Sequence, residues 1–235
     1  MDTSQRPLKA VVFDVDDTLY PERQYVLSGF RAVAGWGAAR LGLDAERSYG
    51  ELAAMFESGV RGDTFDRWLR GHEAPPELVA ELVAVYRDHV PTLALEGDVS
   101  ALLAALRPGY RVGVVTDGHA AVQRAKCAAL RLEPLVDAIV YSDDLGREHW
   151  KPSPRPYLEA CDRLRVSPGE AVYVADNPAK DFLGARRAGM SSIRVTHLRG
   201  EHWRAAPRAP EYAPDLTVDS IAELRRVLLD AADAI

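Results

Sequence analysis

The sequence predicts an α/β protein, with a doubly wound parallel sheet and an all-helical segment inserted after its first strand. Two observations lead to this prediction. Five short apolar runs rich in Val, Ile or Tyr have the length of strands, and helix-length segments separate the later ones. Strands that alternate with helices in this way pair in parallel. In addition, the long interval after the first run contains helical patterns and no convincing strand.

The predicted strands and their helices alternate regularly from the second strand onward. The strands are Ala10–Val15, Arg111–Val115, Ala138–Tyr141, Ala171–Ala175 and Ser192–Val195. The helices around them are Val99–Leu106, Ala120–Leu130, Pro154–Leu164, Pro178–Ala188 and Ser220–Leu229. Asp219 and Ser220 are both candidate N-caps of the last helix.

The interval between the first two strands has the pattern of several helices separated by Gly and Pro. These helices are Tyr25–Leu41, Ala45–Val60, Thr64–Arg70 and Pro76–His89. The pattern gives an insertion of about 70 residues. We therefore expect a core formed by residues 1–20 and 93–235, and a separate helical domain formed by residues 21–92.

Composition narrows the class of protein further. At about 150 residues per domain, 235 residues suit one large domain or a core with an insertion. Hydrophobic residues at 47% and charged residues at 27% are typical of a folded globular chain. The net charge of −6 argues against nucleic acid as a partner. No apolar run approaches the ~18 residues that cross a membrane, and two cysteines are too few for a disulfide framework. We expect a cytoplasmic protein without a membrane partner, and its oligomeric state stays open.

Polar residues gather where the predicted strands end, which is where open parallel sheets bind ligands. They are Asp14, Asp16, Asp17, Thr116, Asp117, Lys151, Asp176, Asn177 and Asp181, and Gly118 follows Asp117. An Asp at a strand end is often only a turn or capping residue. We prefer that interpretation for Asp17, Asp117 and Asp143–Asp144.

The same interpretation does not explain three other carboxylates. Asp14, Asp16 and Asp176 converge on one edge of the sheet and would repel one another without a cation. Oxygen ligands of this kind suit Mg²⁺, which accepts one or two carboxylates together with water and phosphate oxygens. Lys151 precedes Pro152 in a chain that has only four lysines, which favours an anchored ammonium over a surface side chain.

Four motifs in this order resemble those of the haloacid dehalogenase-like (HAD) hydrolase superfamily. They are Phe13–Leu19, Val114–Gly118, Lys151–Pro152 and Val172–Asp181, the last followed by Ala185 and Ala188–Met190. The resemblance spans about the whole chain and implies a Rossmann-like core. The helical insertion matches the alpha-helical cap of the subgroup with phosphoglycolate phosphatases, beta-phosphoglucomutases and haloacid dehalogenases. Two positions depart from the pattern: Asp117, where many relatives have Asn, and Ala175, where Gly is common.

The resemblance implies a phosphatase that forms an aspartyl-phosphate. Asp14 would be the nucleophile, and Asp16 would protonate the leaving oxygen and then deprotonate water. Thr116 and Lys151 would act on the transferring phosphoryl group, which Asp117 and Gly118 would also help to bind.

Mg²⁺ is the cofactor that the resemblance implies. It would be held by Asp14, by the backbone carbonyl of Asp16 and by Asp176. Asn177 would lie around these ligands, and Asp181 would lie around them or near the metal and orient a bound water.

The substrate that we expect is a small phosphomonoester, a sugar or polyol phosphate-like metabolite. Asp16 argues against dehalogenation, because a halide leaves without a proton. Two alternatives stay open, a phosphomutase of the beta-phosphoglucomutase type and a non-catalytic HAD-like protein that binds a ligand or partner. Candidate contacts to the leaving group are Tyr20, Glu22, Arg23, Gln24, Tyr25, Arg61, Arg67 and Trp68. For Trp68 we prefer helix packing to a substrate contact.

Overall fold

The computed structural model describes residues 7–233 and separates into two compact units. Residues Met1–Glu22 and Ala94–Ile235 form one unit, here called the α/β unit. Residues Arg23–Leu93 form the other, here called the helical unit.

The α/β unit is built on a six-stranded sheet in which every pairing is parallel. Its strands are β1 Ala10–Phe13, β2 Arg111–Thr116, β3 Ala138–Tyr141, β4 Ala171–Ala175, β5 Ser191–Val195 and β6 Leu216–Val218. The first five are the strands that the sequence predicts. The sixth was not predicted, because it is a three-residue edge strand whose first two residues are exposed.

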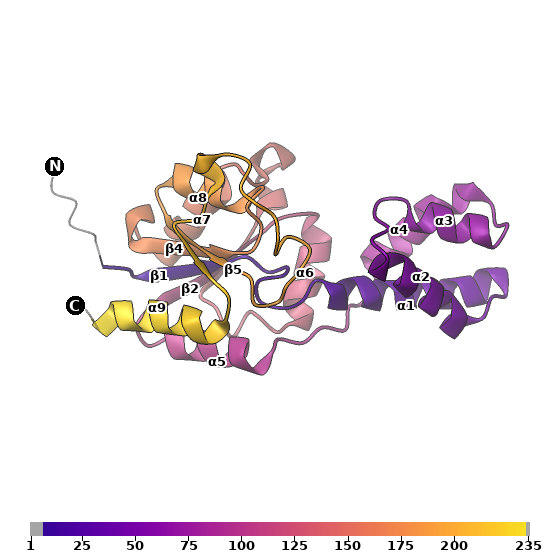
Figure 1. The fold of residues 1–235 in the computed structure, drawn as a ribbon, viewed down its shortest axis with the longest axis horizontal. Coiled ribbons are helices and arrows are strands. Elements are labelled where there is room, and N and C mark those ends of the chain that lie inside the picture. Colours follow the sequence, from indigo (N-terminus) through magenta and orange to yellow (C-terminus); the bar gives the residue numbers. More distant parts are fainter. Residues whose placement is uncertain (1–6, 234–235) are drawn as a thin grey trace. The chain divides into compact units, whose positions relative to one another are not determined.

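The strand order is β3-β2-β1-β4-β5-β6, so the chain moves outward on one side of β1 and then returns to the other. The helices of this unit are α5 Gly97–Leu106, α6 Ala120–Ala129, α7 Arg155–Leu164, α8 Asp181–Ala188 and α9 Ile221–Asp233. In Figure 1, α5 and α9 lie on one face of the sheet and α7 and α8 on the other. The strand order reverses between β1 and β4, and open parallel sheets usually bind ligands beyond the carboxyl ends of the strands at such a point.

Two helix starts in this unit show how side chains set the boundaries. Ser220 is the N-cap of α9, because its hydroxyl accepts a hydrogen bond from the Glu223 N–H at 3.2 Å. The sequence predicts a helix over Pro178–Ala188. Its predicted start was wrong, because α8 begins at Asp181. The preceding residues form a tight turn in which the Asn177 side chain accepts the Ala179 N–H at 2.9 Å.

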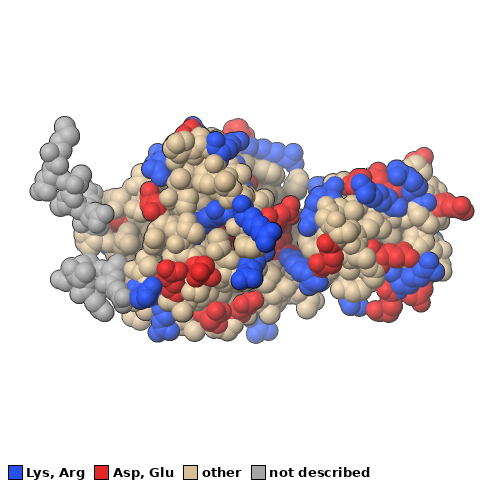
Figure 2. Space-filling model, in the orientation of Figure 1, with Lys and Arg blue, Asp and Glu red and all other residues tan. Residues whose placement is uncertain are grey.

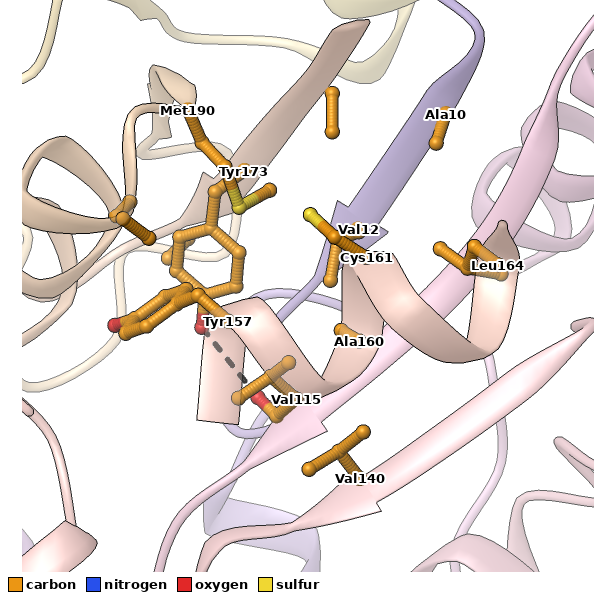
Figure 3. Close-up of a cluster of buried hydrophobic side chains, with 14 of the residues drawn as sticks. Ala10, Val12, Val115, Val140, Tyr157, Ala160, Cys161, Leu164, Tyr173 and Met190 are labelled. Carbon is orange, nitrogen blue, oxygen red and sulfur yellow. Dashed lines mark hydrogen bonds between the residues drawn. The ribbon is translucent and has the colours of Figure 1, made fainter. Parts of the chain in front are cut away.

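The core between the sheet and α7 carries two large aromatic side chains. Tyr157 of α7 and Tyr173 of β4 meet edge to face, with ring centroids 4.8 Å apart, and both are completely buried (Figure 3). The Tyr157 hydroxyl donates to the carbonyl of Asp181 at 2.7 Å. The dashed line in Figure 3 marks the bond from the Tyr173 hydroxyl to the carbonyl of Val115. Packing of this core therefore fixes the loops that follow β2 and β4.

The helical unit consists of four α-helices. They are α1 Arg23–Leu41, α2 Ala45–Glu57, α3 Thr64–Gly71 and α4 Val79–Asp88. Asp44 caps α2 by accepting the Arg47 N–H at 2.7 Å. The second helix ends before the predicted Val60, because the chain turns at Gly59 with a φ of 87°. Phe30, Leu52, Trp68 and Leu82 form the buried core of this unit, so the preference for packing at Trp68 is confirmed.

Short 3₁₀ turns complete the fold, at η1 Pro76–Leu78, η2 Ser142–Leu145, η3 Arg147–His149, η4 Pro168–Glu170 and η5 Pro210–Tyr212. Basic and acidic side chains are interspersed on the face that Figure 2 draws, in both units. Cys127 and Cys161 are buried and unpaired. Within residues 7–233, no helix combines the length and apolar character needed to cross a membrane.

Candidate active site

A buried ion pair joins the end of β1 to the loop after β3. Asp14 is the first residue beyond β1, and its N–H donates to the Val174 carbonyl at 2.9 Å. Its Oδ1 lies 2.6 Å from Nζ of Lys151. The same ammonium lies 3.0 Å from Oδ1 of Asp181 and donates to the Tyr173 hydroxyl at 2.6 Å. Burial lowers the pKa of Lys151, but Asp14 and Asp181 outweigh it and raise this pKa well above its usual value.

Three carboxylates form a tight cluster at this edge of the sheet. Asp14, Asp176 and Asp181 each place one oxygen within 4.8 Å of the others. Burial is the first cause of the raised pKa of both Asp14, about 6, and Asp176, about 9. In Asp176 the charges of Asp181 and Asp14 add to this effect. Three ionised carboxylates that are buried this close together repel one another, so a bound cation would stabilise the cluster.

A second observation fits a metal ion at the same place. Oδ2 of Asp176 is buried and accepts no hydrogen bond from any residue that the structure describes. Asp181 is held by the Asn177 N–H, which donates to its Oδ2 at 3.1 Å. The resemblance places Asn177 around the metal ligands, and Asp181 around them or near the metal. In the structure the Asp181 carboxylate lies in the cluster itself, with Asn177 behind it.

Asp16 lies outside this cluster, and its carboxylate has a different set of partners. Nζ of Lys126 donates to its two oxygens at 2.7 and 2.8 Å. The Tyr20 hydroxyl donates to Oδ1 at 2.6 Å, and the Gln123 amide donates to Oδ2 at 3.2 Å. Burial raises the pKa of Asp16, but the charge of Lys126 and the hydrogen bonds from Lys126 and Tyr20 lower it below its usual value overall. The two acids of the first motif therefore sit in opposite electrostatic environments.

The end of β2 supplies polar groups to the same region. The Thr116 hydroxyl is buried and donates to Oε1 of Gln123 at 2.9 Å. Gly118 adopts a φ of 121°, which only glycine tolerates readily. Oδ1 of Asp117 accepts the Ser142 hydroxyl at 2.6 Å and the Lys151 N–H at 3.0 Å. The Asp117 side chain thus makes long-range bonds rather than the local turn or capping bond that the sequence favours, and it fixes the backbone of Lys151.

Asp17 and Asp143 also serve as structural residues. The Asp17 carboxylate accepts the N–H groups of Glu22 at 2.9 Å and Glu201 at 3.1 Å. It packs so closely on Gly200 that a Cβ there would lie 2.1 Å from the Asp17 Cγ. Asp143 accepts the Ala120 N–H at the start of α6 at 3.0 Å.

The sequence analysis did not identify four polar residues of the site, which are Gln123, Lys126, Tyr173 and Lys180. Lys180 forms no ion pair with any described residue. Burial and Lys151 lower the pKa of Lys180, but Asp181, Asp14 and Asp117 raise it overall. One signal was available, since lysines are rare in this chain and three of its four lie at this edge of the sheet. Gln123 and Lys126, three residues apart on one helix, were also recognisable as a pair on one face.

Comparison with known proteins identifies a family. The profile of the haloacid dehalogenase-like hydrolases matches residues 8–189. A glyceraldehyde 3-phosphate phosphatase of Methanopyrus kandleri is 37% identical over 96% of this chain and 99% of its own length. A protein of the same name from Methanothermobacter thermautotrophicus is 31% identical over 94% of this chain and 100% of its own length.

Solved structures share the fold. A HAD phosphatase from Thermococcus onnurineus is 26% identical, with a TM-score of 0.60, and covers 94% of this chain and 98% of its own. A HAD family hydrolase from Deinococcus radiodurans, with bound phosphate and sodium, is 22% identical and covers 96% of each chain. Its TM-score is 0.68.

Proposed function

The chain belongs to the haloacid dehalogenase-like hydrolase family and is a phosphatase, and we propose that it hydrolyses a small sugar or polyol phosphate through an aspartyl-phosphate on Asp14. The observation that carries this proposal is the buried Asp14 carboxylate, 2.6 Å from the Lys151 ammonium and within the cluster that includes Asp176. Glyceraldehyde 3-phosphate is the first candidate substrate, because two relatives at 37% and 31% identity carry that name.

In the first step, an oxygen of Asp14 attacks phosphorus and the bond from phosphorus to the leaving oxygen breaks. The pKa of Asp16 is low in the free protein, so Asp16 takes up a proton from solvent as the substrate binds. It gives that proton to the leaving oxygen, so that an alcohol rather than an alkoxide departs. Lys151 offsets the negative charge of the phosphoryl oxygens, and Thr116 donates its hydroxyl to one of them. Backbone N–H groups at Asp117 and Gly118 supply further donors.

In the second step, water replaces Asp14 on phosphorus. Asp16, now ionised, removes a proton from the attacking water, and the bond between phosphorus and Asp14 breaks. Inorganic phosphate leaves, and Asp16 is again protonated for the next cycle. Division into two displacements suits a reaction that is extremely slow in water.

Mg²⁺ is the cofactor that we propose, held by Asp14, Asp176 and the backbone carbonyl of Asp16. Asp181, whose carboxylate shares the cluster, and Asn177 complete the site. The orphaned Oδ2 of Asp176 and the raised pKa of its carboxyl support a bound cation. When bound, Mg²⁺ offsets charge on the phosphoryl oxygens.

We further propose that the helical unit is a cap that selects the leaving group and that the enzyme works in the cytoplasm. Of the candidate contacts there, Arg67 pairs with Asp63 at 2.8 Å, and Arg61 lies over the Phe56 ring at 4.0 Å. Tyr20 and Glu22 belong to the α/β unit, where Tyr20 is bonded to Asp16.

A phosphate-release screen tests the proposal. Sugar, polyol and triose phosphates, with glyceraldehyde 3-phosphate among them, are incubated with enzyme and Mg²⁺ or with a chelator. We expect phosphate release that needs Mg²⁺ and is abolished in Asp14→Asn. Asp162→Asn makes the same change at an exposed position of α7 and is expected to keep full activity. Isomerised product without free phosphate would show a phosphomutase instead, and no turnover of any phosphomonoester would contradict the proposal.

A further inference from the structure

Lys126 of α6 lies directly beside the Asp16 carboxylate. Its Nζ bonds to both oxygens of the carboxylate, at 2.7 and 2.8 Å. It also lies 3.5 Å from Oε1 of Glu22. We propose that Lys126 is a positioning residue for the acid–base step, which holds the Asp16 carboxylate where it can reach the leaving oxygen. This inference rests on the role proposed above for Asp16.

The placement of Lys126 is that of a buried, oriented group rather than a surface lysine. Only 3% of its side chain is exposed. A buried ammonium is costly unless it is paired, and Asp16 and Glu22 provide the pairing. The ammonium bonds to both oxygens of Asp16, so it fixes the rotation of the carboxylate as well as its position.

The same helix also orients the neighbouring phosphate-binding group. Gln123 lies three residues before Lys126, accepts the Thr116 hydroxyl at 2.9 Å and donates to Oδ2 of Asp16 at 3.2 Å. One face of α6 therefore sets the distance between the proton donor and the donor to the phosphoryl group. A proton donor must come within about 2.6–3.2 Å of its target, and a misplacement of about 1 Å can cost about 100-fold in rate.

Leaving-group dependence separates positioning of an acid from general support of the fold. Phenolate is a basic leaving group that needs a proton, whereas 4-nitrophenolate departs readily without one. Phenyl phosphate and 4-nitrophenyl phosphate are nearly equal in size, so their ratio of kcat/KM reports the acid step. We expect Lys126→Met to lower kcat/KM for phenyl phosphate by about 10²-fold, and for 4-nitrophenyl phosphate by less than about 5-fold.

Four further variants serve as controls for this test. Lys126→Arg keeps a cation and is expected to restore the wild-type ratio within about 5-fold. Lys9→Met removes a lysine that pairs with Glu170 at 2.6 Å beyond the opposite ends of the strands, and should leave both rates unchanged. Asp16→Asn removes the acid itself, so it should give the largest change in the ratio of kcat/KM for the two substrates. Adding Lys126→Met to Asp16→Asn should change the ratio no further.

The outcomes test the role of Asp16 and the role of Lys126 separately. An unchanged ratio in Asp16→Asn overturns the acid role of Asp16. A changed ratio in Asp16→Asn with an unchanged ratio in Lys126→Met overturns the positioning role of Lys126, as does an equal loss on both substrates. Folding is checked by circular dichroism and thermal melting. If Lys126→Met does not fold, Lys126→Gln, which keeps a donor but no charge, takes the same test.

Discussion

Nζ of Lys151 lies 2.6 Å from Oδ1 of Asp14, and neither side chain is more than 5% exposed. This contact joins positions 137 residues apart in the chain and places a cation beside the proposed nucleophile. Because Asp181 and Tyr173 bind the same ammonium, Lys151 is held from three sides. The pair thus stabilises the site and also supplies charge for catalysis.

Replacing Lys151 should damage both activity and stability. In Lys151→Met, the charge on the phosphoryl oxygens is no longer offset, and we expect kcat/KM to fall by at least about 10²-fold. Breaking a buried pair by removing one partner typically costs about 3–5 kcal/mol. Phosphate release well below the melting temperature and urea unfolding measure the two effects. Lys9→Met, at a pair with a half-exposed lysine, should cost at most about 1 kcal/mol, and turnover like wild type in Lys151→Met would remove Lys151 from the site.

Asp117 should act through its oxygen rather than through its charge. Its Oδ1 accepts both the Ser142 hydroxyl and the Lys151 N–H, and the side-chain oxygen of Asn can accept the same two bonds. We therefore expect Asp117→Asn to keep kcat within about 3-fold and Asp117→Ala to lower it by about 10-fold or more. Steady-state kinetics on 4-nitrophenyl phosphate compares the two. Equal losses in both variants would show that the negative charge itself is needed.

The sequence predicted the sheet and the main site residues because both follow from local patterns. Each strand that ends in Asp14, Thr116 or Asp176 is a short apolar run, and parallel pairing brings those ends to one edge. The third-motif Lys151 came from resemblance and from the rarity of lysine. These features needed no knowledge of which side chains touch across the fold.

The features that the sequence did not predict depend on tertiary contacts or belong to very short elements. Lys126 and Tyr173 lie within apolar patterns, and only the fold shows that they bond to Asp16 and Lys151. β6 has only three residues, which is too short for an alternating pattern to mark it as a strand. The first turn predicted for α8 is instead a turn made by the Asn177 side chain, which competes locally with helix formation.

Two glycines should respond in opposite directions to the same substitution. A Cβ at Gly184 in α8 would lie 2.4 Å from Cε2 of Tyr157 and 3.0 Å from the Ser153 carbonyl, so Gly184→Ala must displace packed atoms. We expect it to lower the free energy of unfolding by about 1–3 kcal/mol. Gly50 in α2 has nothing within 4 Å of such a Cβ, and Gly50→Ala should raise stability by about 0.5–1 kcal/mol. Chemical unfolding of both variants checks this, and destabilisation by Gly50→Ala would contradict it.

Removing divalent metal should make stability depend on pH through Asp176. Burial and neighbouring carboxylates raise its pKa from 3.8 to about 9 in the folded protein. Between these values the unfolded chain has lost the proton that the folded chain keeps, so stability falls as pH rises, by up to about 1.4 kcal/mol per pH unit. Urea unfolding of chelator-treated protein at several pH values between 5 and 8 measures this slope.

Asp176→Asn supplies the matched control, because its amide stays neutral throughout this range. The difference in stability between wild type and Asp176→Asn should therefore shrink or reverse as pH rises in the chelated samples. Adding Mg²⁺ should stabilise the wild type more at pH 8 than at pH 6, since the cation binds the ionised carboxylate and its binding releases the proton. Asp176→Asn should gain much less from Mg²⁺. Parallel pH profiles for the two chelated proteins would show that Asp176 is already ionised without metal, and a similar gain from Mg²⁺ in both would place the cation elsewhere.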